Sequence, residues 1–559
     1  MVLTLDYDGA LLASETWDFG GGATGKVRTA YSADEWPTNV VVWGTSGPGS
    51  VVTYSYDADG LVTSAAVSGG VSLLVRSDAT TALLDSTRAS GLAVRYGHNP
   101  YAELTSTAAW YGADTLFAAE YTRDALGRIS RIVERLPGGT TDRGYTYDDR
   151  GRLTGVRDLL ANMDLARYGY DRNGNRIGLL TATDSITAAY DAQDRLIDRG
   201  AMHYGYTANG ERTTATGPGG TTTTTYDLLG NLLEVETAGG DTLGYTIDGR
   251  NRRVERRLNG VLTGRWVYAN DLAVIGELDS AGALRKRFVH ATRDHDPDLL
   301  VVRNASGPDS TYGLVTDQLG SVRAVVNVNT GFVAQRLDYD AWGVVTLDTN
   351  PGFQPFGFAG GLYDPASGLV RFGVRDYDPQ GGVWTSKDPS VATLKTTNLY
   401  SYAYSDPLNA ADHDGRMPVG PGVADSKGPD DGGVTLNPLE QVLAATPAVP
   451  SGIVNAGAGF GDAVTFGVSR LVRQLEGIES TVEECSAAYR GGATVGWMVD
   501  LSLTAAGWAK SLGVGARVAI HGPHHEFGVL GRLSHVQLNT WEKGVRGSGG
   551  VLRIPLPWR

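Results

Sequence analysis

Two aspartates near residue 400 are candidates for acid–base catalysis by a pair of carboxyl groups. Asp388 and Asp412 lie in the segment Gly368–Met417, which reads GLVRFGVRDYDPQGGVWTSKDPSVATLKTTNLYSYAYSDPLNAADHDGRM. When two carboxyl groups are brought close together, repulsion between their charges keeps a proton on one of them. One group can then act as acid and the other as base in the hydrolysis of a peptide bond. Asp-Pro is also common turn chemistry, so a purely structural role for Asp388 stays open.

A second group of reactive side chains gathers in the last fifty residues. Four of the nine histidines fall within fifteen residues, and the group comprises His521, His524, His525 and His535, with Glu526 and Asn539 nearby. The same stretch carries seven Lys or Arg residues against two Glu. Histidine can act as a base near neutral pH or bind a metal that stabilises charge on phosphorus, and basic residues hold a phosphate backbone. This composition favours a nuclease. A cluster of structural histidines and a metal-independent ribonuclease that uses two histidines remain alternatives.

A tyrosine-aspartate repeat over residues 50–345 predicts the strands and turns that would hold the two aspartates. Clear copies are YSYDADGLV (54–62), YTRDALGRI (121–129), YTYDDRGRL (145–153), YGYDRNGNRI (168–177), AYDAQDRLI (189–197), YGYTANGER (204–212), TYDLLGNLL (225–233), YTIDGRNRR (245–253) and DYDAWGVV (338–345). Each copy predicts strand, turn and strand. Tyr-x-Tyr places two rings on one face of a strand, and Asp-x-x-Gly suits a tight turn. One hairpin cannot bury its face alone, so consecutive copies must stack.

Composition narrows the class of protein. The 76 glycines and the 20% of charged residues favour turn-rich β structure. The single cysteine, Cys485, excludes an internal disulfide framework and a cysteine-rich zinc site. The net charge of −14 falls mainly before residue 417 and argues against nucleic acid binding on the outside of the repetitive part. The first residues show no basic and apolar signal pattern. We expect no membrane span, because the most apolar stretch, Ala493–Trp508, is short and contains Asp500.

The repeats, the phrase DQLGSVRAVVN at 317–327 and the Gly368–Met417 segment together resemble the Rhs/YD-repeat family. That family includes bacterial Rhs polymorphic toxins, the C components of Tc insecticidal toxins and, more distantly, the teneurins. The resemblance implies a mainly β fold, a spiralling β-sheet cocoon followed by a small α/β or α+β effector domain. The expected boundaries are a repeat shell at 1–367, an Rhs-associated core at 368–416, a linker and helical pre-toxin region at 417–510, and a histidine-rich toxin module at 511–559.

The resemblance also implies a self-cleaving site. In the family an Asp-Pro pair, an Asn-Leu-Tyr block and a terminal aspartate motif stand in the order of Asp388-Pro389, Asn398–Tyr400 and Asp412–Arg416 here. Asp388 and Asp412 then correspond to the catalytic aspartates, and the expected cut lies between Arg416 and Met417. The chain departs from the family pattern twice: His413 replaces the usual proline, and Arg416 replaces the usual leucine. Arg375 and Asp378 are expected to brace the site.

The phrase GPHHEFGVLGRLSHVQLNTWEKG resembles the signatures of HNH/endonuclease VII-like toxin nucleases. By that resemblance, one of His524 and His525 binds a divalent metal, Zn or Mg, and the other activates water. His535 and Asn539 are four residues apart, which places them on one face of a predicted helix, and they would complete the site. His521 and Glu526 are further candidate metal ligands. The shell itself is expected to need no cofactor.

The predicted function is therefore a toxin whose shell encloses a C-terminal effector and releases it by aspartate-dependent autoproteolysis. The resemblance implies four partners: a cognate immunity protein, a secretion machine, another shell component, and nucleic acid as effector substrate. It implies a protein that is secreted or delivered into a target cell. A surface adhesion or structural protein and a toxin with a non-nuclease effector are the alternative functions.

Overall fold

The computed structural model describes residues 1–47, 49–304, 306–389, 398–416 and 418, together with the backbone of three strands between residues 515 and 555. The chain divides into two compact units, Met1–Asp430 and Asp431–Arg559. The predicted linker and helical region at 417–510 lies outside the described residues apart from residue 418. So do Met417, His524, His525 and Glu526.

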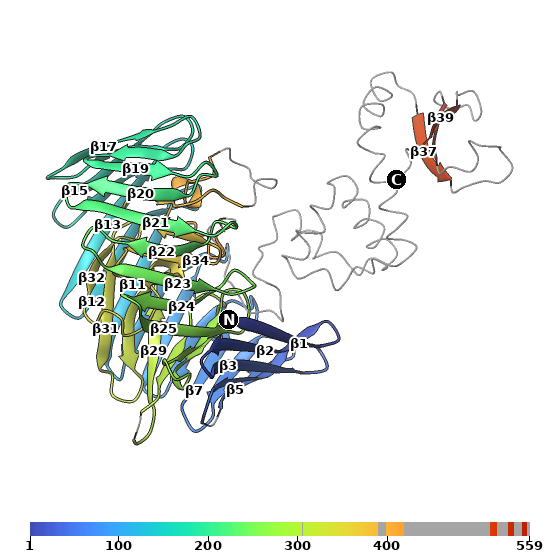
Figure 1. Ribbon diagram of the computed structural model, residues 1–559, viewed down its shortest axis with the longest axis vertical. Helices are drawn as coiled ribbons and strands as arrows, with labels where there is room; N and C mark the ends of the chain where they lie inside the picture. Colours follow the sequence, from blue (N-terminus) through green and yellow to red (C-terminus); the bar gives the residue numbers. More distant parts are fainter. Residues whose placement is uncertain are drawn as a thin grey trace. The chain divides into compact units, whose positions relative to one another are not determined.

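The first unit is built on one antiparallel meander, in which each of 32 strands pairs with the next along the chain (Figure 1). Its first half comprises β1 (Val2–Asp8), β2 (Leu11–Gly20), β3 (Ala23–Tyr31), β4 (Pro37–Gly44), β5 (Ser50–Tyr56), β6 (Val62–Val67), β7 (Ser72–Ser77), β8 (Leu84–Ala89), β9 (Leu92–His98), β10 (Leu104–Tyr111), β11 (Asp114–Arg123), β12 (Ile129–Leu136), β13 (Gly139–Tyr147), β14 (Leu153–Asp158), β15 (Met163–Tyr170) and β16 (Arg176–Leu180).

The second half continues in the same sense. It comprises β17 (Ser185–Tyr190), β18 (Leu196–Arg199), β19 (Met202–Tyr206), β20 (Arg212–Gly217), β21 (Gly220–Tyr226), β22 (Leu232–Glu236), β23 (Thr242–Ile247), β24 (Arg253–Leu258), β25 (Val261–Tyr268), β26 (Val274–Leu278), β27 (Leu284–Val289), β28 (Leu299–Val302), β29 (Ser310–Thr316), β30 (Val322–Asn327), β31 (Val333–Tyr339) and β32 (Val345–Asp348). The prediction of a mainly β fold is confirmed.

The repeat chemistry explains the turns of this meander. In the turn that follows β13, the Oδ1 atom of Asp148 accepts backbone hydrogen bonds from Arg150 at 2.9 Å and from Arg152 at 3.0 Å. Gly151 has a φ of 84°, a left-handed conformation that glycine adopts without strain. The predicted sequence of strand, turn and strand is therefore confirmed at this copy, and the aspartate and glycine perform the roles expected of them.

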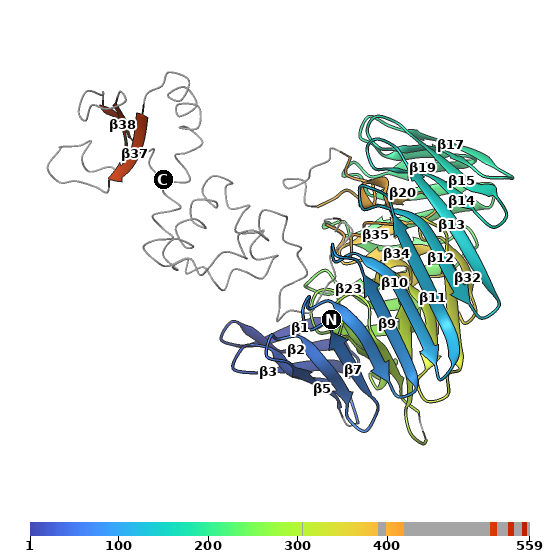
Figure 2. The ribbon, with the colours of Figure 1, turned by 180° about the vertical axis from the view of Figure 1, so that it is seen from behind.

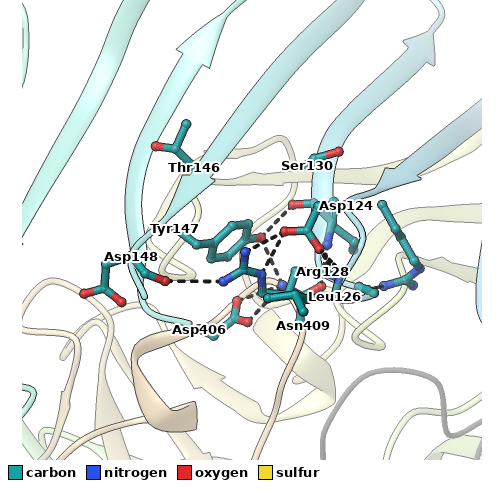
Figure 3. Close-up of polar contacts among 12 residues, drawn as sticks. Asp124, Leu126, Arg128, Ser130, Thr146, Tyr147, Asp148, Asp406 and Asn409 are labelled. Atoms are coloured by element: carbon teal, nitrogen blue, oxygen red, sulfur yellow. Dashed lines mark hydrogen bonds and ion pairs between the residues drawn. The ribbon is translucent and has the colours of Figure 1, made fainter. Parts of the chain in front are cut away.

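Neighbouring copies are joined by an arginine that follows the turn (Figure 3). Arg128 donates from Nε to Asp124 Oδ2 at 2.8 Å, and its guanidinium lies 4.6 Å from the centre of the Tyr147 ring. The hydroxyl of Tyr147 donates to the carbonyl oxygen of Ile129 at 2.6 Å. Each such unit thus combines a charged hydrogen bond, a cation–π contact and a tyrosine hydrogen bond between consecutive hairpins. The arrangement recurs at Arg152 over Tyr170.

The meander winds back on itself, so strands far apart in sequence lie face to face. β3 and β4 contact β25, β26 and β27, and β11 contacts β30. Figure 2 shows the early strands β9, β10 and β11 (blue) in front of later strands of the chain (green and yellow). Polar bonds join these layers: Trp17 Nε1 donates to Asp248 Oδ2 at 3.2 Å, and Glu15 pairs with Arg252 at 3.0 Å. Glu15, Trp17 and Arg252 are all nearly inaccessible to water. The principal core fills the space between the layers and includes Phe117, Phe288 and Val325.

A second, short sheet carries the segment after the meander. It contains β33 (Leu362–Asp364), β34 (Leu369–Phe372), β35 (Arg375–Asp378) and β36 (Val383–Trp384), flanked by the 3₁₀ turns η1 (Phe358–Gly360) and η2 (Ala403–Ser405). Phe372, Tyr377, Trp384 and Tyr402 form a buried aromatic cluster, in which the rings of Tyr377 and Tyr402 stack 4.1 Å apart. This cluster belongs to the principal core, so the short sheet packs on the meander as part of one unit.

The described part of the second unit is a three-stranded antiparallel sheet. It contains β37 (Gly515–His521), β38 (His535–Trp541) and β39 (Val551–Pro555). The helix predicted over His535 and Asn539 is wrong, because both residues lie in β38. The prediction relied on spacing, and residues four apart share a face in a strand as they do in a helix. Within the described residues, no helix has the length and apolar character needed to cross a membrane.

Candidate functional site

The two aspartates singled out from the sequence meet on one arginine. The Nη2 atom of Arg375, in β35, lies 2.7 Å from Asp388 Oδ2 and 3.0 Å from Asp412 Oδ2. All three side chains are buried, and Asp412 is 0% exposed. The structure therefore brings together two carboxyl groups that are separated by 23 intervening residues of sequence. Their oxygens share a single donor nitrogen, the close approach that paired acid–base chemistry requires.

The chain just before the predicted cleavage position is held by the same groups. The backbone N–H of Arg416 donates to Asp412 Oδ1 and to Asp414 Oδ1, each at 2.9 Å. Arg375 Nε donates to the carbonyl oxygen of Gly415 at 2.5 Å. Gly415 has a φ of 69°, and a β-carbon there would crowd the backbone of Phe372 and Arg375. One carboxyl group of the pair is thus hydrogen-bonded to the residue that precedes the expected cut.

The electrostatics of the site favour a proton on Asp412. Burial raises the pKa of the Asp412 carboxyl to about 7; Asp414 and Asp388 also act to raise it, while Arg375 opposes the shift. Burial also lowers the pKa of the Arg375 guanidinium, and the carboxylates around it counter that effect. Three carboxyl groups surround one guanidinium here, so holding a proton relieves their mutual repulsion. The site can therefore present a protonated and an ionised carboxyl group near neutral pH.

In several copies of the repeat, the turn is followed by an arginine, such as Arg128 or Arg152, which we call the ladder arginine. Repeat turns that lack it hold the segment Gly368–Arg416, which carries the site. At two turns, asparagine stands where Arg128 or Arg152 stands in other copies. Asn398 Nδ2 donates to Asn175 Oδ1 at 2.7 Å, and Arg371 Nη2 donates to Asn231 Oδ1 at 2.7 Å. Asn175 and Asn231 in turn donate to the aspartates of their own turns. An amide can accept from a neighbour while it donates to the turn, which an arginine cannot do.

The stretch between Tyr402 and Asp412 has an anchor of its own (Figure 3). Asn409 accepts the backbone N–H of Ile129 at 2.8 Å and donates to the hydroxyl of Tyr147 at 2.9 Å. Asn409 also donates to both oxygens of Asp406, whose pKa is raised to about 6 by burial. Asn409 therefore joins the stretch between Tyr402 and Asp412 to the copies of the repeat that contain Ile129 and Tyr147.

Arg375 and Asp378, both predicted to brace the site, contact different partners. Arg375 contacts both aspartates, as its predicted bracing role requires. Asp378 instead pairs with Arg212 at 2.6 Å, so it fastens β35 to β20. His413, at the position where the family has proline, stacks on His295 with ring centres 3.5 Å apart. No pattern in the sequence indicates His295, because the contact joins residues more than a hundred positions apart.

The histidine group is described only by its backbone. His521 in β37 stands opposite His535 in β38, and Asn539 stands opposite Arg517. His524, His525 and Glu526 lie outside the described residues. Across the described ranges, no group of three His, Cys, Asp or Glu side chains is placed to hold a metal. A Zn or Mg site in the effector stays a prediction.

Comparison with known proteins agrees with this architecture. The family described as Teneurin YD-shell matches residues 1–408. Teneurin-3 of Danio rerio is 29% identical over 305 residues, covering 51% of this chain and 11% of the relative. Teneurin-4 of Homo sapiens is 29% identical over 304 residues, covering 51% and 10%. The chain thus spans about a tenth of the length of these relatives.

Two solved toxin structures share the fold. The crystal structure of TcdB2-TccC3-TEV matches with a TM-score of 0.58 at 16% identity, covering 72% of this chain and 23% of that one. The Tc holotoxin pore of Photorhabdus luminescens matches with a TM-score of 0.58 at 14% identity, covering 73% and 23%. At these identities the likeness is one of fold. The family match covers well over half of the sequence, and the chain belongs to the Teneurin YD-shell family of YD/Rhs-repeat proteins.

Proposed function

We propose that the segment Gly368–Arg416 is an aspartate-based self-cleaving site that cuts the chain between Arg416 and Met417. The observation that carries the proposal is the contact of one buried guanidinium, Arg375, with both Asp388 and Asp412. The hydrogen bond from the Arg416 N–H to Asp412 supports it further, because it joins one carboxyl group of the pair to the residue that precedes the expected cut.

The division of labour follows from the surroundings of each carboxyl group. Asp412, which holds its proton up to about pH 7, is the general acid that protonates the leaving amine or the carbonyl oxygen. Asp388, paired with Arg375, is the base that takes a proton from the attacking water. Hydrolysis then adds water across one peptide bond, leaving a carboxylate on Arg416 and an amino group on Met417.

Mass spectrometry of the purified full chain tests this function. Wild-type protein is expected to give two products that meet between residues 416 and 417, whereas Asp388→Asn and Asp412→Asn give the intact chain. Asp198→Asn, a change of a partly exposed aspartate remote in sequence from the segment, is the control and is expected to cleave normally. An intact wild-type chain under native conditions would contradict the proposal.

The segment released by this cut is proposed to be an effector that attacks nucleic acid. The proposal rests on the histidines and basic residues of the last fifty positions, with His524, His525 and His535 as the catalytic candidates. Degradation of DNA and of RNA by the purified chain, with and without added Zn²⁺ or Mg²⁺, tests it. Loss of activity in His524→Ala and His525→Ala would support a nuclease, and retained activity in both variants would exclude these roles.

A second candidate function, as an adhesive or structural surface protein, is favoured by the match to the teneurin family. An adhesive shell needs no self-cleavage. The mass-spectrometric experiment therefore separates the two candidates, because only the toxin requires cleavage. Under the toxin proposal the partners are an immunity protein, a secretion machine and further shell components, and the protein is exported or delivered to a target cell.

A further inference from the structure

The buried carboxyl group of Asp412 has a second carboxyl neighbour besides Asp388. The backbone N–H of Arg416 is shared between Asp412 Oδ1 and Asp414 Oδ1, each at 2.9 Å. Two acceptor oxygens that converge on one N–H lie close together, and the two side chains are hydrogen-bonded to each other. The other oxygen of Asp412, Oδ2, accepts from Arg375 at 3.0 Å. The two oxygens of Asp412 therefore have different surroundings.

The contact between Asp412 and Asp388 passes through a cation. Arg375 Nη2 lies 2.7 Å from Asp388 Oδ2 and 3.0 Å from Asp412 Oδ2. A guanidinium donates hydrogen bonds and accepts none, so it favours the ionised form of both carboxyl groups. A direct hydrogen bond between two carboxyl groups requires instead that one of them keep its proton, because ionised carboxylates only accept. The proton on Asp412 is therefore expected at Oδ1, on the side of Asp414.

Burial decides which of these two aspartates keeps the proton. Asp412 is 0% exposed, whereas Asp414 is partly exposed. Water can solvate a charge on Asp414, while a charge on Asp412 would be buried. The backbone of Asp414 is also fixed, because its carbonyl oxygen accepts the Val374 N–H at 3.1 Å and a β-carbon on Gly373 would collide with that oxygen. The turn between β34 and β35 thus holds Asp414 in place beside Asp412.

The other ionisable groups around the two aspartates keep the same charge near neutral pH. Burial raises the pKa of the Tyr402 and Tyr404 hydroxyls above the usual value of 10, and it lowers the pKa of His413 to about 4. These three side chains are therefore uncharged near neutral pH. Arg375 and Arg416 stay positively charged, as arginines in proteins do.

We propose that Asp414 is a positioning residue of the self-cleaving site, where its carboxylate holds the proton of the general acid on Asp412 Oδ1. This inference rests on the proposed self-cleavage, and it assigns the proton to the contact with Asp414 and not to a contact with Asp388. The charge of Asp414 disfavours ionisation of Asp412, so Asp412 stays protonated at the pH at which cleavage takes place. The proton then passes from Asp412 to the peptide that is cut, and Asp414 keeps its charge throughout.

The pH dependence of cleavage by Asp414→Asn tests the inference. An amide keeps the shape of the side chain and can still accept from the Arg416 N–H, but it removes the charge that disfavours ionisation of Asp412. The pH above which the cleavage rate falls is expected to shift down by about one unit. The variant should then cleave about tenfold more slowly than the wild type at about pH 8 and at the wild-type rate at about pH 5. An unchanged profile, or an equal loss of rate at every pH, would overturn the proposal.

Two further variants complete this experiment. Asp414→Ser, whose hydroxyl can also accept from the Arg416 N–H, is expected to show the same shift and serves if the amide variant does not fold. Asp271→Asn is the matched control, because Asp271 lines the same small cavity as His413 and the change removes one negative charge from that part of the fold. The Asp271 side chain is 60% exposed and pairs with Arg250 at 2.6 Å, so the variant is expected to keep the wild-type profile. An equal shift in Asp271→Asn would rule out a specific role of Asp414.

A measurement without cleavage separates a failure of this inference from a failure of the proposed function. Asp388→Asn is expected to stay intact, and its midpoint of urea unfolding at about pH 5 and about pH 8 reports on Asp412. Because burial raises the pKa of Asp412 to about 7, the stabilisation by its protonated form is lost as the pH rises through that value. Adding Asp414→Asn is expected to make this fall in the midpoint smaller, and an equal fall would overturn the inference. A smaller fall in a protein that never cleaves would uphold the proton contact of Asp412 with Asp414 and contradict only the self-cleavage.

Discussion

At the scale of single residues, Asp412 is the group whose behaviour most depends on its surroundings. Its pKa is raised from 3.8 to about 7, chiefly by burial. A carboxyl group with a raised pKa stabilises the folded state fully below its unfolded pKa, and this contribution is lost as the pH rises through the folded pKa of about 7. The Asp412 carboxyl therefore favours the fold less at neutral pH than at pH 4. A group that weakens the fold at neutral pH is typical of a site kept for chemistry.

The pH dependence of cleavage follows from the same change in pKa. With Asp412 as the acid, the cleavage rate is expected to fall about tenfold per pH unit above about pH 7. The rate can be measured by gel densitometry on uncleaved protein refolded from denaturant at pH values from about 5 to about 9. A rate that stays constant over this range would show that protonated Asp412 is not required.

Arg375 is expected to be required for cleavage as an arginine and not merely as a cation. Its Nη2 contacts both aspartates while its Nε donates to the Gly415 carbonyl oxygen. A lysine has a single ammonium group, which cannot occupy both of these positions at once. Arg375→Lys is expected to slow cleavage by about 100-fold.

Arg195→Lys is the control for that variant. It changes a ladder arginine that pairs with Asp191 and is expected to cleave at the wild-type rate. The pH–rate profile distinguishes a role of Arg375 in positioning the aspartates from a role in folding. Loss of Arg375 is expected to shift the pH above which the cleavage rate falls, whereas a purely structural defect would lower the rate equally at every pH. Wild-type cleavage by Arg375→Lys would contradict the role.

At the scale of elements, the site depends on how the Gly368–Arg416 segment docks on the repeat turns. Asn398 reaches the turn of Asn175, and Arg371 reaches the turn of Asn231. Tyr400 donates to the carbonyl oxygen of Gly210 at 2.8 Å. These three contacts use turns that lack the ladder arginine, whereas Asn409 binds the copy that contains Arg128 and Tyr147.

Asn175→Ala tests this docking. The change leaves the buried amide of Asn398 short of its best acceptor, which is expected to cost about 1–3 kcal/mol. Cleavage is expected to slow, and the midpoint of urea unfolding to fall. Asn173→Ala is the matched control, since Asn398 uses only the backbone oxygen of Asn173. Equal effects of the two variants would show that the docking contact is not specific.

At the scale of the whole molecule, the meander and the short sheet form one unit with a common core. Aromatic side chains from the last part of this unit, Tyr400 and Tyr402, are at most 1% exposed. The bonds from the paired aspartates to Arg375 and to the Arg416 N–H all lie within residues 1–416. The site is thus assembled by the unit that would remain after cleavage.

Removal of the C-terminal part is therefore expected to leave this unit folded. A chain ending at Arg416 should show the same thermal midpoint as the corresponding product of the full chain, measured by circular dichroism. A chain ending at Trp384 loses the buried Tyr400 and Tyr402 and is expected to melt at a lower temperature or to aggregate. A large loss of stability in the 1–416 chain would show that the second unit supports the first.

Much of this architecture follows from local rules. The Tyr-x-Tyr-Asp-x-x-Gly copies specify strands and turns because alternation, aspartate turns and positive-φ glycines act over a few residues. The three strands of the second unit are harder to predict, and the helix expected at His535 is wrong for that reason: short segments have weak periodicity, and an i, i+4 spacing fits both structures.

The repeat, the mainly β fold and the two aspartates as a candidate pair can be predicted from the amino-acid sequence. The folded chain alone reveals that Arg375 bridges these aspartates, that Asp378 pairs with Arg212 and that His413 stacks on His295. The range of the interactions explains this difference. Turn and strand preferences are written in neighbouring residues, whereas shared guanidinium contacts, burial and the pKa of Asp412 depend on segments that the winding of the sheet brings together.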